Sequence, residues 1–154
     1  MKKSSSIKLA LNQNINLDGI IYSVIGIDTY QLKNVLGEAK TWYSYTLIDK
    51  ENNKTWITYG HAESYFVQWR VITEKEFKQE STKTFMFDFS GIANISFEGN
   101  QGYSTPTAEI IWFSVTGRTY DFVAIERFLE QKKDTIDISD SDYLTGTILK
   151  NFTI

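Results

Sequence analysis

The sequence has no cysteine, one histidine and one proline among its 154 residues. The absence of cysteine excludes a disulfide scaffold, a cysteine-based zinc site and a catalytic thiol. One histidine is too few for a histidine-rich metal site. The formal net charge of −3 provides no basic surface for nucleic acid. We therefore expect a protein without cofactor, metal ion or nucleic-acid partner.

The sequence also contains no convincing targeting segment. Three serines follow Lys2 and Lys3, and the apolar positions from Ile7 to Leu11 are too few and too interrupted for the core of a signal peptide. No apolar run approaches the roughly 20 residues that span a bilayer. We expect a bacterial-type, cytoplasmic protein with a disordered amino terminus at residues 1–6 and a single β-rich domain over residues 7–154.

Aromatic residues are abundant and follow a strand-like pattern. The chain has four tryptophans, nine tyrosines and ten phenylalanines, and residues of this kind suit a pleated, half-buried surface. Short alternating segments bounded by turn signals predict an all-β fold, a twisted antiparallel sheet that forms a small barrel or a sandwich. The predicted strands cover residues 7–17, 20–27, 42–49, 55–59, 65–72, 85–89, 92–97, 109–115, 120–125 and 143–152.

Three segments have patterns other than a simple strand. Residues 28–40 are equally compatible with a long hairpin loop and with one helical turn. The spacing of Thr73 and Glu76 is that of a capping box and predicts one helical turn or a loop. Residues 124–133 are the best helix candidate, because Ile125, Phe128 and Leu129 share a helical face, although continuation of the strand from Tyr120 competes with it. We expect this helix to cover one opening of a barrel.

The order of several motifs resembles a bacterial family catalogued as domain of unknown function 4178. The resemblance runs from about Asp18 to the end of the chain. It is carried by Tyr22-x-Val24-x-Gly26, Trp42-x-x-Tyr45-x-Leu47-x-Asp49, Trp56, Trp69, Gly91-x-Ala93, Gly99 and Tyr143-Leu-x-Gly146-x-x-Leu149-x-x-Phe152. It implies a nearly all-β fold and supplies no activity, cofactor or catalytic residue. Ile27-Asp28 stands where the family usually has an arginine after the glycine.

The polar residues form no catalytic pattern. His61 and Glu63 could form a base and its partner, but no nucleophile motif accompanies them, and we interpret His61 as a turn residue. The acidic segment from Asp137 to Asp142 lacks the glycine and the final glutamate of a calcium loop, and we interpret it as a solvated turn. Nothing brings two carboxylates together as glycoside hydrolysis requires, and Asp88 is expected to face solvent. We therefore predict that the protein is not an enzyme.

The aromatic residues are the remaining candidates for a site. The tryptophans could line a groove or fill the core, with Trp42 and Trp56 the first choices for the core. Strand alternation places Tyr43 and Tyr45 on the face opposite Trp42, where they could form an aromatic surface. We predict a non-enzymatic interaction module that binds a protein partner through an aromatic sheet face or edge. The alternative is a β-barrel that binds a small molecule or a carbohydrate. The predicted binding residues are Tyr43, Tyr45, Trp42, Trp56 and Trp112; the oligomeric state is not predicted.

Overall fold

The fold was determined from a computed structural model. It describes residues 8–34, 39–60, 65–80, 85–99, 107–116, 119–131, 136–138, 141–150 and 152–153. The amino-terminal residues 1–6, predicted to be disordered, and His61 lie outside these ranges.

Strands make up most of the described chain, as the sequence predicts. In sequence order the elements are β1 (Asn14–Leu17), β2 (Ile20–Asn34), β3 (Ala39–Ile48), β4 (Lys54–Tyr59), β5 (Phe66–Ile72), α1 (Glu74–Glu80), β6 (Phe85–Gly99), β7 (Thr107–Val115), β8 (Phe122–Gln131), β9 (Ile136–Ile138), β10 (Asp142–Ile148) and β11 (Phe152–Thr153). Among the described residues, no helix has the length and apolar character needed to cross a bilayer.

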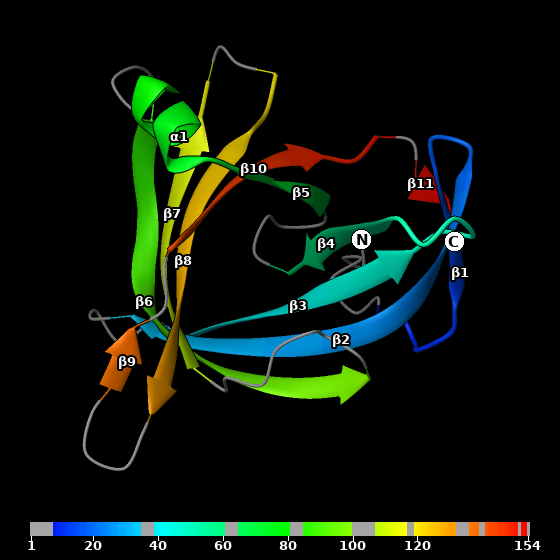
Figure 1. Cartoon of the computed structure of the whole chain (residues 1–154), viewed down its shortest axis with the longest axis horizontal. Helices are drawn as coiled ribbons and strands as arrows, with labels where there is room; N and C mark the ends of the chain where they lie inside the picture. The colour runs from blue at the N-terminus through cyan, green and yellow to red at the C-terminus, as the bar shows by residue number, and fades with distance from the viewer. Residues whose placement is uncertain are drawn as a thin grey trace, which may run out of the picture.

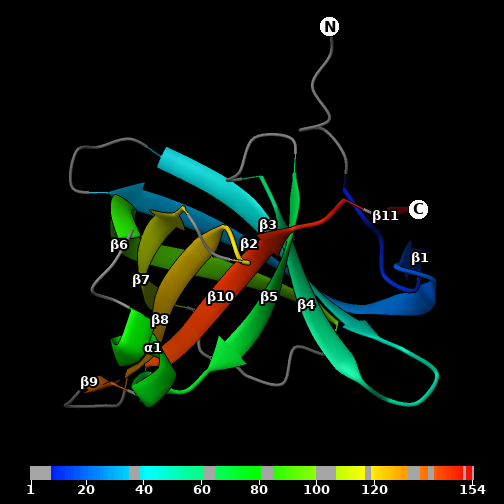
Figure 2. The ribbon, with the colours of Figure 1, turned by 90° about the horizontal axis from the view of Figure 1, so that it is seen from above.

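Eight strands close into an antiparallel barrel (Figures 1 and 2). Around the barrel the order is β2-β3-β4-β5-β10-β8-β7-β6, and β6 pairs back with β2 to complete the circle. The sequence left open a barrel or a sandwich, and the pairing of β2 with β6 decides for the barrel. In eight-stranded barrels the interior is just wide enough to be filled by side chains or to hold one small ligand.

Bulges in the two longest strands change which residues face the interior. In β6 the register shifts between Phe87 and Phe89, so Phe87 pairs with Phe113 on the outer face, whereas Phe89 pairs with the inward-facing Trp112. Asp88 lies at this bulge and is exposed, as predicted. A bulge adds one residue to a strand and therefore reverses its inside–outside alternation.

The bulge in β2 is matched by a glycine at the end of β6. The register of β2 shifts between Val24 and Gly26, and Gly26 pairs with Gly99. Gly99 has a φ of +81°, and a Cβ at this position would lie 2.4 Å from the carbonyl oxygen of Ile25. Any larger residue would collide with the β2 backbone, so glycine is required where these two strands meet.

The apolar residues form two separate clusters. The inner cluster lies within the barrel wall and contains Tyr30, Leu32, Trp42, Val67, Trp69, Phe89, Ala93, Ile95, Ala108, Ile110, Trp112 and Ala124. The outer cluster lies on the other face of β2 to β5, where β1 and residues 8–13, here called the amino-terminal segment, complete it. Its members are Leu9, Ile15, Leu17, Val24, Ile27, Tyr45, Leu47, Ile57, Tyr59 and Phe66.

Three local predictions were wrong, each because long-range pairing overrides the local pattern. Residues predicted as a helix at 124–133 form β8 up to Gln131, which pairs with β7 and β10. Within residues 28–40, predicted as a long hairpin loop or one helical turn, β2 continues to Asn34 and β3 begins at Ala39. The predicted acidic turn begins instead with β9, which pairs with the end of β8.

The short helix α1 begins at the predicted capping box. The Thr73 amide donates to Glu76 Oε1 at 2.9 Å, and the Glu76 amide donates to the Thr73 hydroxyl at 3.0 Å. These reciprocal bonds satisfy two amides that would otherwise be free at the start of a helix. The hydrogen bonds from the Thr73 amide and the Thr73 hydroxyl hold the pKa of the Glu76 carboxyl below its usual range. In addition, Phe77 of α1 packs on Tyr143 of β10, so α1 lies beside the barrel wall.

Candidate functional site

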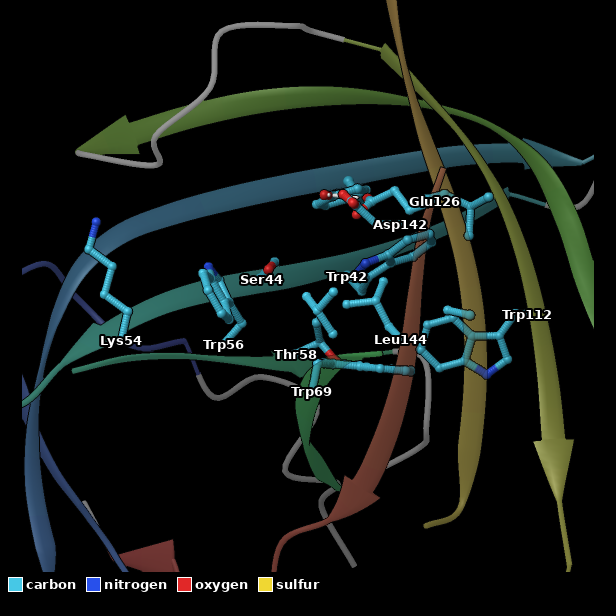
Figure 3. Close-up of a pocket in the computed structure, with 14 residues that line it drawn as sticks. Trp42, Ser44, Lys54, Trp56, Thr58, Trp69, Trp112, Glu126, Asp142 and Leu144 are labelled. Carbon is cyan, nitrogen blue, oxygen red and sulfur yellow. Dashed lines mark hydrogen bonds between the residues drawn. The ribbon is translucent and has the colours of Figure 1, made fainter. Parts of the chain in front are cut away.

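The interior of the barrel contains a cavity of about 390 Å³ (Figure 3). Its wall is formed by side chains that alternate along β2, β3, β4, β5, β7, β8 and β10, and it includes all four tryptophans of the chain. Pockets that bind small molecules commonly have volumes of about 300–1,000 Å³ and walls that are mostly apolar with a few polar groups. The cavity therefore has the size and position of a ligand site.

Three tryptophans form the deep part of the wall. Trp42, Trp69 and Trp112 are all buried. The Trp69 and Trp112 rings meet edge to face with 4.7 Å between centroids, and Phe89 stacks on Trp112 at 5.3 Å. Such edge-to-face and offset contacts are the favoured arrangements of aromatic rings. These contacts fix the orientation of the aromatic wall.

Trp69 is held by a polar contact and by an adjacent glycine. Its indole N–H donates to the Thr58 hydroxyl at 2.7 Å. On the neighbouring strand β10, a Cβ at Gly146 would lie 2.7 Å from two carbons of the Trp69 ring. The absence of a side chain at Gly146 lets the indole lie close against the β10 backbone, which leaves the centre of the barrel open.

Trp56 occupies a more open part of the cavity. It is 37% exposed, in contrast to the other three tryptophans. Its cross-strand partner is the buried Trp69, so the two indoles lie on the same inward face of the sheet. Lys54 and Val71, which also line the cavity, are exposed as well. We identify this region, with Lys54, Trp56 and Val71, as the mouth of the cavity.

Two carboxylates line the cavity on adjacent strands. Glu126 of β8 and Asp142 of β10 are register partners, so their Cβ atoms are about 5 Å apart. The Tyr30 hydroxyl reaches from β2 and donates to Glu126 Oε2 at 2.8 Å. Figure 3 shows Glu126 and Asp142 close together, well apart from Lys54. The polar groups of the wall are thus concentrated on one side.

The carboxyl of Glu126 has an unusual proton affinity. Its pKa is raised to about 7, chiefly by burial; the hydrogen bond from Tyr30 acts in the opposite direction, and the negative charges of Asp142 and Asp28 contribute to the rise. Asp28 itself is buried on β2. A group with a pKa near neutrality can take up or release a proton under physiological conditions, and such groups are frequent at functional sites.

The structure separates the five predicted binding residues into two sets. Trp42, Trp56 and Trp112 line the cavity. Tyr43 and Tyr45 lie on the opposite face of β3, in or against the outer cluster. Tyr45 has no exposed surface and Tyr43 is half-buried, because the amino-terminal segment covers this face. The expected exposed aromatic surface at these two tyrosines is therefore wrong, and so is the expectation that Trp56 is a core residue.

The sequence interpretation did not include Tyr30 or Glu126 in the site, and it assigned Asp142 to a solvated turn. Glu126 was missed because a helix over residues 124–133 does not place it on the inward face of a strand. When the same residues are placed on a strand, Phe122, Ala124 and Glu126 alternate onto one face, and this alternation was the available signal.

Comparison with known proteins gives no match, neither to a family model nor to a curated protein or a solved structure. The resemblance to domain of unknown function 4178 therefore stays a prediction.

Proposed function

We propose that the protein binds a small molecule inside its barrel. This function was the alternative prediction from the sequence, and the observation that supports it is the cavity of about 390 Å³ lined by all four tryptophans. Well-packed interiors have few voids larger than a water molecule. A hollow of this size, next to closely packed aromatic rings, is more easily understood as a binding site than as a packing defect.

The proposal can be tested with a neutral fluorescent probe, Nile red, and with a variant that fills the cavity. Ser44 is half-buried and lines the cavity, so we expect Ser44→Trp to occupy part of the volume and to weaken Nile red binding at least about tenfold. Ser96→Trp on the exposed surface of β6 is the matched control and should bind like the native protein. Absence of binding to the native protein, or equal binding by both variants, would contradict the proposal.

We also propose that the protein binds a partner protein, as predicted from the sequence, but through a surface other than the one expected at Tyr43 and Tyr45. Phe85, Phe87 and Phe113 form a row of ring contacts on the outer face of β6 and β7, and Phe87 is 59% exposed. Exposed aromatic residues are frequent anchors of protein interfaces. In a pull-down from cells, Phe87→Ser should lose any stoichiometric partner, whereas Ile21→Ser, at a similarly exposed apolar residue of β2, should retain it. Retention by both variants would remove this surface from consideration.

A further inference from the structure

The charges in the wall of the cavity point to the chemical class of the ligand. Glu126 and Asp142 come from neighbouring strands and line the cavity together. The buried carboxylate of Asp28 acts on Glu126 with the same sign as Asp142. Among the cavity-lining residues that the structure describes, Lys54 alone is basic, and it is exposed at the mouth. The side of the cavity around Glu126 is therefore negative.

The aromatic wall lies directly beside this negative side. Tyr30, which donates to Glu126, stacks on Trp42 with 5.1 Å between ring centroids and an interplanar angle of 13°. The rings of Trp42 and Trp112 also contact each other, with 6.4 Å between their centroids. The faces of tryptophan rings attract cations through their quadrupoles, and more strongly when water is excluded. Carboxylates and indoles thus favour the same ligand charge.

We propose that the cavity binds an organic cation, a protonated amine or quaternary ammonium with an apolar body, with its charge at Glu126 and Asp142 and its apolar part between the tryptophans. This inference rests on the proposed small-molecule function. Two neighbouring carboxylates in a partly desolvated site repel each other, and a cation relieves this repulsion, which a neutral ligand cannot do. An anionic ligand would add to the repulsion.

The test compares three probes with one aromatic ring and a side chain of similar length but different charge. These are 2-phenylethylamine, 2-phenylethanol and 3-phenylpropanoate, with binding measured by calorimetry and by displacement of Nile red at pH 8. The amine should bind at least about tenfold more tightly than the alcohol, because it adds the charge-assisted and cation–π contacts. The propanoate should bind more weakly than the alcohol.

Variants assign the selectivity to the carboxylates. Glu126→Gln keeps the shape of the side chain and can still accept the hydrogen bond from Tyr30, and it should reduce the preference for the amine about tenfold without weakening the alcohol. Asp142→Asn should have a smaller effect in the same direction, because Asp142 is the more exposed of the two. Glu98→Gln, at an exposed carboxylate of β6, is the control and should leave the preference unchanged.

The outcomes separate this inference from the proposed function. A preference for the amine that depends on Glu126 supports both. Nile red binding without a preference for the amine, or with a preference that persists in Glu126→Gln, overturns the cation assignment and leaves the small-molecule function intact. Failure of Nile red and of all three probes to bind overturns both.

Discussion

The two faces of β3 differ in how completely they are packed. On the outer face, Tyr45 and Leu47 have no exposed surface, and the amino-terminal segment covers them. On the inner face, Trp42 and Ser44 line a cavity, although the same sheet also supplies large aromatic side chains there. Both faces carry aromatic side chains, so the difference in packing does not follow from residue type. The outer cluster stabilises the fold, whereas the inner cluster leaves a cavity.

The largest expected effect on stability lies in the outer cluster. Leu47→Ala removes a completely buried side chain and should lower the free energy of unfolding by about 3 kcal/mol. Leu144→Ala in the cavity wall should cost less than half as much, because Leu144 is half-buried and already borders empty space. Urea unfolding of both variants measures the difference. Equal costs would mean that the two regions are packed alike.

The all-β, antiparallel architecture could be predicted from the sequence because strand alternation is a local property, whereas the choice of a barrel over a sandwich depends on the pairing of β2 with β6. The strands around Trp42, Trp56 and Trp69 were predicted, and in the structure consecutive ones pair antiparallel. The alternation of tryptophans onto one face follows from the same pattern. The site was predictable to this extent, and three of the five predicted binding residues line the cavity.

The carboxylates could not be predicted, because they meet through pairing of distant segments. Asp142 pairs with Glu126 only when β8 is a strand, and residues 124–133 have a helical pattern of their own. Likewise, Tyr45 was expected on a surface, because nothing in β3 indicates that residues near Leu9 return to cover it. The bulge at Asp88, which turns Phe89 inward, also leaves no mark on the alternation of the sequence.

The second-largest expected effect on stability concerns Gly146, whose lack of a side chain leaves space for the Trp69 ring. Gly146→Ala places a Cβ 2.7 Å from the Trp69 ring and 2.8 Å from a Val67 methyl group. The indole must move toward the cavity, and we expect a loss of about 2 kcal/mol in the free energy of unfolding. The tryptophan fluorescence spectrum of the protein should change with it. Thr147→Ala, at the exposed neighbouring residue of β10, is the control. An unchanged stability would show that the wall yields freely.

The carboxyl of Glu126 is a group of the cavity wall that should lower the stability of the folded protein. Because its folded pKa is about 7 and the ordinary value is 4.5, the folded state binds more protons than the unfolded state between these values. Stability should therefore fall as the pH rises from about 4.5 to 7 and then level off. Glu126→Gln removes this loss, so it should be more stable than the native protein by about 1–2 kcal/mol at pH 8 and nearly equal at pH 4.

Urea unfolding of Glu126→Gln at several pH values measures this dependence, and Glu98→Gln on the exposed surface should follow the native curve. A native stability that rose between pH 5 and 7, with Glu126→Gln parallel to it, would contradict the raised pKa. The same result would weaken the assignment of a negative, desolvated side to the cavity.

The smallest expected effect concerns the polar contact inside the outer cluster. The Leu9 amide donates to the Tyr45 hydroxyl at 3.2 Å, and both residues are buried. Tyr45→Phe leaves that amide unsatisfied and should lower the free energy of unfolding by about 1 kcal/mol. The Leu9 amide should then exchange its hydrogen faster. Tyr43→Phe, on the same face but half-buried, should cost less.

Alkaline pH measures the burial of the same hydroxyl. Burial raises the pKa of the Tyr45 hydroxyl to about 12, against an ordinary value of 10. The folded state therefore retains this proton when the unfolded state has lost it, and the native protein should lose stability as the pH rises from about 10 to 12. Tyr45→Phe should lack this part of the loss. If Tyr45→Phe and Tyr43→Phe behaved alike in both measurements, the outer cluster would bury Tyr45 no more completely than it buries Tyr43.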